Sequence, residues 1–298
     1  MSTLIQNWLN FGLQQMAAEA YLDQFLLGPR SFVEVLSNGN NNEDVIPVDQ
    51  FDGKTRFVNM AGVPNANQIM GSAQAFVSRY QIVDHHANDA TGFSATLLFD
   101  TQSQQYTLSM RSTEYRDQVV GGDWERDGIS GADGEIADHG FALAQLVSME
   151  RYWNELTAPG GRLAPGAKVN VTGYSLSGHL ATVFTEMHVD QVLQTYTFNG
   201  AGRGFVSEVG QDGQPIEQTL RRMVLDLEGR LLAFDPSGTL FQSGVTGNIY
   251  DDARYDAARA ATLTQFQTIG TGNLQFFPIP GGVLKKKTVK KTVSGTVF

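Results

Sequence analysis

The residues best suited to do chemistry lie in VNVTGYSLSGHLA, where Ser175 follows a strand-like run and precedes an amphipathic helical run. A serine between such a strand and helix sits on a sharp turn, where only small side chains fit two positions before and after it. Gly173 stands two positions before Ser175. Ser177 stands two positions after it and Gly178 follows, so Gly-x-Ser-x-Gly is changed by one small residue. A hydroxyl raised there beside a helix N-terminus can attack a carbonyl, with amides stabilising the developing charge. The alternative is that Ser175 only caps the following helix.

The segments around Ser175 alternate between strand and helix patterns, which is typical of an α/β fold. The expected elements, in chain order, are the hairpin strands FSATLLFD and YTLSMR, a helix ending before Pro159 with Leu146, Met149, Trp153 and Leu156 on its buried stripe, the strand KVNVTG, the helix after Ser175, the strand QTYTFNG, the helix PIEQTLRRMVLDLEG stopping at Gly229, and the strands RLLAFD and GNIY. We therefore expect a mostly parallel central sheet with helices on both faces.

The remaining segments define the domain organisation. Residues 1–28 carry apolar residues at helical spacing and no cationic leader region, which predicts a helix docked on the domain rather than an ordinary signal peptide. Composition predicts a polar loop over residues 36–45 and a Gly- and Asp-rich loop over residues 112–138. We expect one α/β domain over residues 1–284, followed by a solvated Lys-rich tail over residues 285–298.

The composition excludes several classes of function. The 298 residues include no Cys, so disulfides, thiolate zinc sites and cysteine nucleophiles are absent. Residues 1–284 carry 16 basic and 31 acidic side chains, a balance that repels phosphate backbones, so we expect no nucleic-acid partner. No run reaches the about 18 apolar residues of a membrane span.

Several stretches, in this order, resemble the lipase class 3 (fungal-lipase-like) family of α/β-hydrolases. They are TLSMRSTEY, GGDWERD, ADHGFALAQ, the turn VTGYSLSGHLA and the strand TYTFNGAG, within about residues 75–270. The chain looks most similar to bacterial versions found in large secreted proteins with calcium-binding repeats. The resemblance implies an α/β-hydrolase fold, a secreted location and a serine carboxylester hydrolase of lipase or esterase type. The acidic, Cys-free composition fits the cytoplasm as well, which is the alternative location.

The resemblance also implies roles for individual residues. Ser175 would attack an ester carbonyl and form an acyl-enzyme, and the backbone N–H of Leu176 together with Thr113 would hold the oxyanion. Ser112 replaces the family's usual Gly. Lipids with long acyl chains, short esters, phospholipids and synthetic polyesters all remain possible substrates, because pocket shape decides among them.

The third member of a catalytic triad, the acid, must lie at the carboxyl end of a later strand. Asp251 follows the expected strand GNIY and, with Asn248, resembles the family's Asn-x-x-Asp. Asp252 stands beside it, and Asp235 after RLLAF is the alternative. Asp235 also fits a plain turn, and Asp251 and Asp252 also fit a solvated strand end.

The expected base is missing, because no His follows His188, whereas the fold's triad runs Ser, acid, His. His188 lies about 18 Å along the helix from Ser175 and is excluded. His179 and His139 match family positions with packing roles, with a base role for either as the alternative, and the pair at residues 85–86 is expected in a loop. One hypothesis is that a His from elsewhere replaces the missing base, and another is a truncated or rearranged enzyme with weak activity. A second hypothesis is therefore a binding or structural module that kept the hydrolase fold without turnover.

No cofactor is expected for this chemistry. The loop acids could hold a hard cation such as Ca²⁺, but their spacing is not that of an EF-hand, which favours a flexible acidic loop. These acids are Asp123, Asp127, Asp133, Glu135 and Asp138. The segment GAGRG lacks the spacing of a dinucleotide site and is expected to shape the substrate cleft.

Overall fold

The computed structural model describes residues 3–20, 22, 26, 31–37, 66–114, 117–118, 122–211 and 213–270, without the side chains of residues 3–5 and 66–72. Most of the predicted loop at 36–45 and the whole tail at 285–298 lie outside the described residues, so those predictions and the boundary at 284 remain untested. Within the described part, no helix is both long and apolar enough to cross a membrane.

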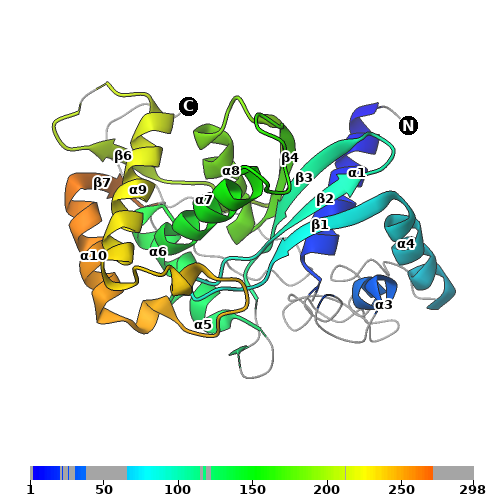
Figure 1. Ribbon diagram of the computed structural model, residues 1–298, viewed down its shortest axis with the longest axis horizontal. Helices are drawn as coiled ribbons and strands as arrows, with labels where there is room; N and C mark the ends of the chain where they lie inside the picture. The colour runs from blue at the N-terminus through cyan, green and yellow to red at the C-terminus, as the bar shows by residue number, and fades with distance from the viewer. Residues whose placement is uncertain are drawn as a thin grey trace, which may run out of the picture.

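A five-stranded sheet forms the centre of the molecule (Figure 1), in the order β1-β2-β3-β4-β5. Its strands are β1 (Tyr80–His86), β2 (Ala95–Asp100), β3 (Gln105–Met110), β4 (Val169–Tyr174) and β5 (Val192–Phe198). The first three strands form an antiparallel meander, and β4 and β5 continue parallel to β3. Only β2 therefore runs against the other four strands, and the fold is mixed α/β with a sheet whose strands mostly share one direction. The short turn between β2 and β3 permits only antiparallel pairing, whereas helical crossovers precede β4 and β5.

The predicted hairpin is confirmed, with Ala95 opposite Met110 and Asp100 opposite Gln105. The expectation of a loop at His85 and His86 is wrong, because both belong to β1. His85 Nδ1 lies 2.9 Å from the Thr96 hydroxyl of β2, and this cross-strand contact extends the pairing to the strand end.

Helices cover both faces of the sheet, as expected. In chain order they are α1 (Thr3–Ala18), α3 (Phe32–Ser37), α4 (Ala66–Arg79), α5 (Trp124–Asp127), α6 (Ala132–His139), α7 (Leu143–Thr157), α8 (Leu176–Met187), α9 (Ile216–Phe234) and α10 (Ala253–Gln265). Figure 1 shows α7 and α8 over one face and α1 over the other. The sequence predicts a helix over residues 1–28, but in the structure α1 ends at Ala18. It packs on the sheet through Phe11, which stacks on Tyr196 with ring centroids 4.2 Å apart.

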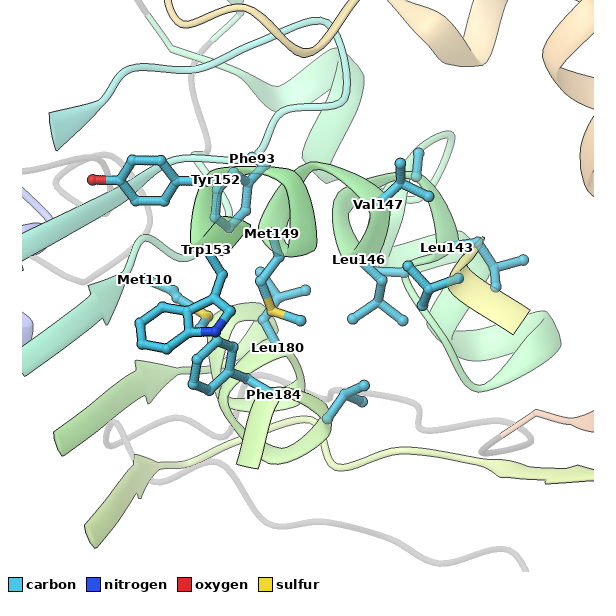
Figure 2. Packing of buried hydrophobic residues seen from close by; sticks show 14 of the residues in the cluster. Phe93, Met110, Leu143, Leu146, Val147, Met149, Tyr152, Trp153, Leu180 and Phe184 are labelled. Atoms are coloured by element: carbon cyan, nitrogen blue, oxygen red, sulfur yellow. The ribbon is translucent and has the colours of Figure 1, made fainter. Parts of the chain in front are cut away.

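The main core lies between the sheet and α7, α8 and α9. The predicted stripe of α7 is confirmed, since Leu146, Met149, Trp153 and Leu156 are all at most 2% exposed. Figure 2 shows Trp153 and Met149 pointing from α7 toward α8, where the Trp153 ring meets Phe184 edge to face at 5.1 Å. Of this helix pair, α8 packs directly on β3 and β4, and Ser175 lies between β4 and the start of α8.

Three predicted segments have a different structure. RLLAF continues α9 to Phe234, because Leu227 and Leu231 extend its buried face and Gly229 lies on an open side of the helix. GNIY is not a strand; it leads into the short 3₁₀ helix η3 (Ile249–Asp251), anchored where Ile249 N–H donates to Ala90. The loop at 112–138 contains α5 and α6, whose first turns carry acidic residues. A separate ribbon pairs β6 (Phe205–Glu208) with β7 (Phe266–Ile269).

Candidate active site

Ser175 joins β4 to α8 in a strained backbone conformation, with φ 50° and ψ −116°. A non-glycine residue in such a region costs about 1–3 kcal/mol and persists only when its surroundings hold it. Here the Ser175 N–H donates to Phe198 at 3.1 Å, and the Ser175 carbonyl accepts from Gly178 at 3.0 Å and Ala201 at 2.9 Å. The side chain makes no capping hydrogen bond to α8, so the capping alternative is wrong. The half-buried hydroxyl is therefore presented by the turn and is not used by the helix.

The small residues around Ser175 are required by close backbone contacts. A Cβ at Gly173 would lie 2.0 Å from the Ser177 carbonyl oxygen, and one at Gly178 would lie 2.4 Å from the Gly200 Cα. Ser177 fits because its hydroxyl folds back on the turn. It accepts from the Tyr174 N–H at 2.8 Å and donates to the Tyr174 carbonyl at 2.9 Å. The changed position of the motif thus stabilises the elbow.

The loop at the end of β3 presents one unpaired amide. The Arg111 N–H donates to Ser94 at 2.9 Å, the Ser112 N–H donates to Glu19, and the Glu114 N–H donates to Asp127 at 3.0 Å. The Thr113 N–H, between them, has no acceptor among the described residues, although Thr113 is fully buried. Buried amides without acceptors are rare, so this one is a candidate binding group.

A second unpaired amide lies directly after the elbow. The Leu176 N–H, at the start of α8, also has no acceptor in the described part of the chain. The Thr113 hydroxyl, in contrast, donates to the Asp133 carboxylate at 3.1 Å. Desolvation raises the pKa of Asp133 to about 7, although this side chain retains some exposed surface. The two backbone amides of Thr113 and Leu176 therefore remain as candidate oxyanion donors.

The candidate acids lie in separate turns. Asp251 ends η3, is exposed, and accepts from the Asn248 side chain at 2.9 Å. Asp252 caps α10 and pairs with Arg254, whose hydrogen bond lowers the pKa of that carboxyl. Asp235 follows α9 and accepts from the Leu240 N–H at 2.9 Å, in the turn that the sequence also suggested. The structure joins none of the three to a His within the described residues.

His179 lies directly beneath the elbow and is structural. Its Nδ1–H donates to the Gly202 carbonyl at 2.6 Å, and its Nε2 accepts from the Ala142 N–H at 3.2 Å. Burial lowers its pKa to about 4, so the ring is neutral and both nitrogens are occupied. It fixes the 200–204 loop, which also meets Gly140 through the Gly204 N–H at 2.8 Å.

Of the five His, all of which the structure describes, His139 alone makes no hydrogen bond through its ring. His86 pairs with Asp89 at 3.1 Å, and His188 pairs with Glu150 at 2.7 Å. Burial, aided by the charge of Arg259, lowers the pKa of His139, which ends α6 beside the 200–204 loop. No His hydrogen-bonds Ser175 within the described residues.

The acidic loop is built into the protein by hydrogen bonds and ion pairs. Buried Arg126 pairs with Asp123 and donates to the Asp89, Val245 and Gly247 carbonyls. Asp127 accepts from Glu114 and Gln145, Asp133 from Thr113, and Glu135 from Tyr255 and Arg259. In the described part of the chain, no three His, Asp or Glu side chains gather as metal ligands would.

Sequence reasoning missed the contributions of Arg126 and Glu19. Arg126 stands within the family-like segment GGDWERD, so the motif carried a signal for it. Glu19 lies 93 positions before Ser112, whose amide it binds, and no local pattern indicated that contact. Two cavities, of about 350 and 150 Å³, lie at the far end of α8 and beside Tyr152, away from the elbow.

Comparison with known proteins identifies no counterpart. No protein-family model, no curated protein and no solved structure matches this chain.

Proposed function

We propose that this protein is a serine carboxylester hydrolase with an α/β-hydrolase fold and that Ser175 is its nucleophile. The observation that carries the proposal is the backbone of Ser175, held at φ 50° between a buried strand and a helix N-terminus. The same strained geometry exposes the nucleophile in serine hydrolases of this fold. The unpaired amides of Thr113 and Leu176 support it as oxyanion donors.

The proposed reaction is acyl transfer through a covalent intermediate. Ser175 Oγ attacks the ester carbonyl carbon and passes its proton to a general base, and the carbonyl oxygen, now negative, accepts from the Thr113 and Leu176 N–H groups. The tetrahedral intermediate collapses, the C–O bond to the alcohol breaks, and the alcohol leaves with the proton that the base returns. Water then attacks the acyl-enzyme by the same route and releases the acid.

His139 is the first residue to test as the base. Its ring has no hydrogen-bond partner in the described residues, and its lowered pKa keeps it neutral near pH 7. The resemblance to secreted lipases leaves fatty-acid esters, short esters, phospholipids and polyesters as substrate classes. It also implies export from the cell, which fractionation of the native host would test.

The test is hydrolysis of p-nitrophenyl butyrate and p-nitrophenyl palmitate by wild type, Ser175→Ala, His139→Gln and a control, Ser78→Ala. Ser78 is exposed on α4, outside the elbow. We expect turnover by wild type and Ser78→Ala, loss in Ser175→Ala, and labelling of Ser175 by a fluorophosphonate probe. Equal rates in wild type and Ser175→Ala, with no labelling, would overturn the proposal.

A hydrolase-fold module without turnover is the second candidate. It is favoured by the lack of any hydrogen bond between Ser175 and a His in the described part of the chain. An inert Ser175 in a folded protein would favour this candidate.

A further inference from the structure

The last turns of α1, together with Glu19 directly after the helix, bury polar side chains against the sheet, where a helix normally places apolar ones. Gln14, Gln15 and Glu19 are 2%, 3% and 4% exposed. Burying such groups is unfavourable unless each finds hydrogen-bond partners, so their contacts show what this end of α1 does.

Gln15 links α1 to the carboxyl end of β3. Its side-chain amide donates to the Met110 carbonyl at 2.8 Å and to the Glu19 carboxylate at 2.7 Å. The Ser109 hydroxyl donates to the Gln15 side-chain oxygen at 3.2 Å and shares a hydrogen bond of 2.6 Å with Thr172 of β4. A buried chain of hydrogen bonds thus runs from α1 through β3 to a residue three positions before Ser175.

Glu19 binds the loop that follows β3. Its two carboxylate oxygens accept from the Ser112 N–H at 3.2 and 3.3 Å. On the other side of Thr113, the Asp127 carboxylate accepts from the Glu114 N–H at 3.0 Å. The peptide units before and after the one that carries the Thr113 N–H are therefore both fixed.

This arrangement determines where the unpaired amide points. The orientation of the 112–113 peptide unit depends on dihedral angles that its two fixed neighbours leave little freedom to change. The Glu19 carboxylate accepts from the Ser112 N–H, and the Arg111 and Glu114 N–H groups also have acceptors. The Thr113 N–H is therefore the one backbone donor that stays available within residues 111–114. Preorganised donors of this kind stabilise a developing oxyanion without rearrangement.

We propose that Glu19, held by Gln15, is a positioning residue that orients the Thr113 amide toward the oxyanion of the reaction at Ser175. This inference rests on the proposed hydrolase function. Glu19 touches the loop and not the substrate, so the N-terminal helix acts on catalysis through the backbone of Ser112. Burial, and then the nearby Glu19, raise the pKa of Tyr174, the residue before Ser175.

The test compares wild type, Glu19→Ala, Glu19→Gln, Ser175→Ala and the control Glu155→Ala, an exposed Glu on α7. We expect kcat of Glu19→Ala to fall about 10- to 100-fold with KM nearly unchanged, somewhat less than the loss of an entire oxyanion donor. Glu19→Gln retains a carbonyl acceptor and should recover to within about threefold of wild type. Glu155→Ala should match wild type, and thermal unfolding should verify that every variant is folded.

Amide hydrogen exchange of residues 111–114 supplies a readout that does not depend on turnover. We expect the Ser112 amide to lose protection in Glu19→Ala and to keep it in Glu19→Gln. A folded Glu19→Ala with kcat within threefold of wild type, or with unchanged exchange at Ser112, would overturn the positioning role while Ser175-dependent hydrolysis stands. Equal hydrolysis by wild type and Ser175→Ala would instead remove the reaction itself and overturn both proposals.

Discussion

Replacing Ser177 with Ala tests whether this hydroxyl stabilises the elbow or is only a tolerated substitute for Gly. The Ser177 hydroxyl is buried and bonds both the N–H and the carbonyl of Tyr174, at 2.8 and 2.9 Å. Its removal leaves a largely covered peptide group without partners, which costs about 1–3 kcal/mol. Ala recovers about 0.5 kcal/mol through its higher helix propensity in the first turn of α8. We therefore expect a loss of about 2 kcal/mol in the free energy of unfolding.

Urea denaturation measures this loss directly. With a slope of about 3 kcal/mol/M, the midpoint should fall by about 0.7 M while the slope stays unchanged. Ser177→Gly recreates the Gly-x-Ser-x-Gly pattern, yet it should be about 1 kcal/mol less stable than Ser177→Ala, because glycine loses more backbone entropy. Ser78→Ala is the matched control, since its hydroxyl is exposed and should shift the midpoint little. A loss below about 0.5 kcal/mol in Ser177→Ala would refute a stabilising role for the hydroxyl.

Four further changes test other parts of the structure by the same denaturation assay. Gly229→Ala should raise the free energy of unfolding by about 0.5–1 kcal/mol, because Gly229 lies inside α9 and a Cβ there would meet open space. A lower free energy of unfolding in Gly229→Ala would contradict the presence of open space at this position. Arg126→Ala should lower it by about 3–5 kcal/mol at pH 7 by leaving buried Asp123 without its partner, whereas a neutral effect would argue against that pair. Burial raises the pKa of Asp133 from 3.8 to about 7, a contribution to stability of about 4 kcal/mol that is complete below about pH 4 and is lost as pH rises through about 7; Asp133→Asn should remove this pH dependence, and parallel stability profiles of wild type and variant would contradict it. Ser175→Gly should raise stability by about 1–2 kcal/mol by relieving the positive φ and should abolish hydrolysis; unchanged stability would mean that Ser175 is not strained.

The elements that were predicted correctly carry their signals locally. The alternation in β2 and β3, the buried stripe of α7 and the strand–turn–helix around Ser175 each lie within a few residues of sequence. Gly229 misled the prediction, because glycine commonly ends helices, but here the apolar period continues through Leu231. The mixed sheet order could not be read from the alternation of elements, since pairing partners are set by non-local packing.

In the candidate site, too, only the features encoded by local sequence could be predicted. Ser175 follows from a local motif, and its geometry agrees with that motif. The donors around it are backbone amides, whose availability depends on which neighbouring amides are occupied. Glu19 follows α1 and Asp127 ends α5, and both bind amides of a loop after β3, so no pattern near Thr113 could indicate them. A sequence motif identifies the nucleophile, while the groups that stabilise charge are selected by tertiary contacts.

The strain at Ser175 bears on the choice between an enzyme and an inactive module. Ser175 is held at positive φ by backbone hydrogen bonds with Phe198, Gly178 and Ala201, and by close contacts at Gly173 and Gly178. A module that only binds a partner gains nothing from a strained, uncapped serine, and a single Gly at this position would relax it. An unpaired buried amide at Thr113 is a second feature that is unfavourable in the resting fold, and acyl transfer would use both features together. These two departures, one at the elbow and one in the loop after β3, are each maintained by separate hydrogen bonds, and both favour the proposed hydrolase over the module.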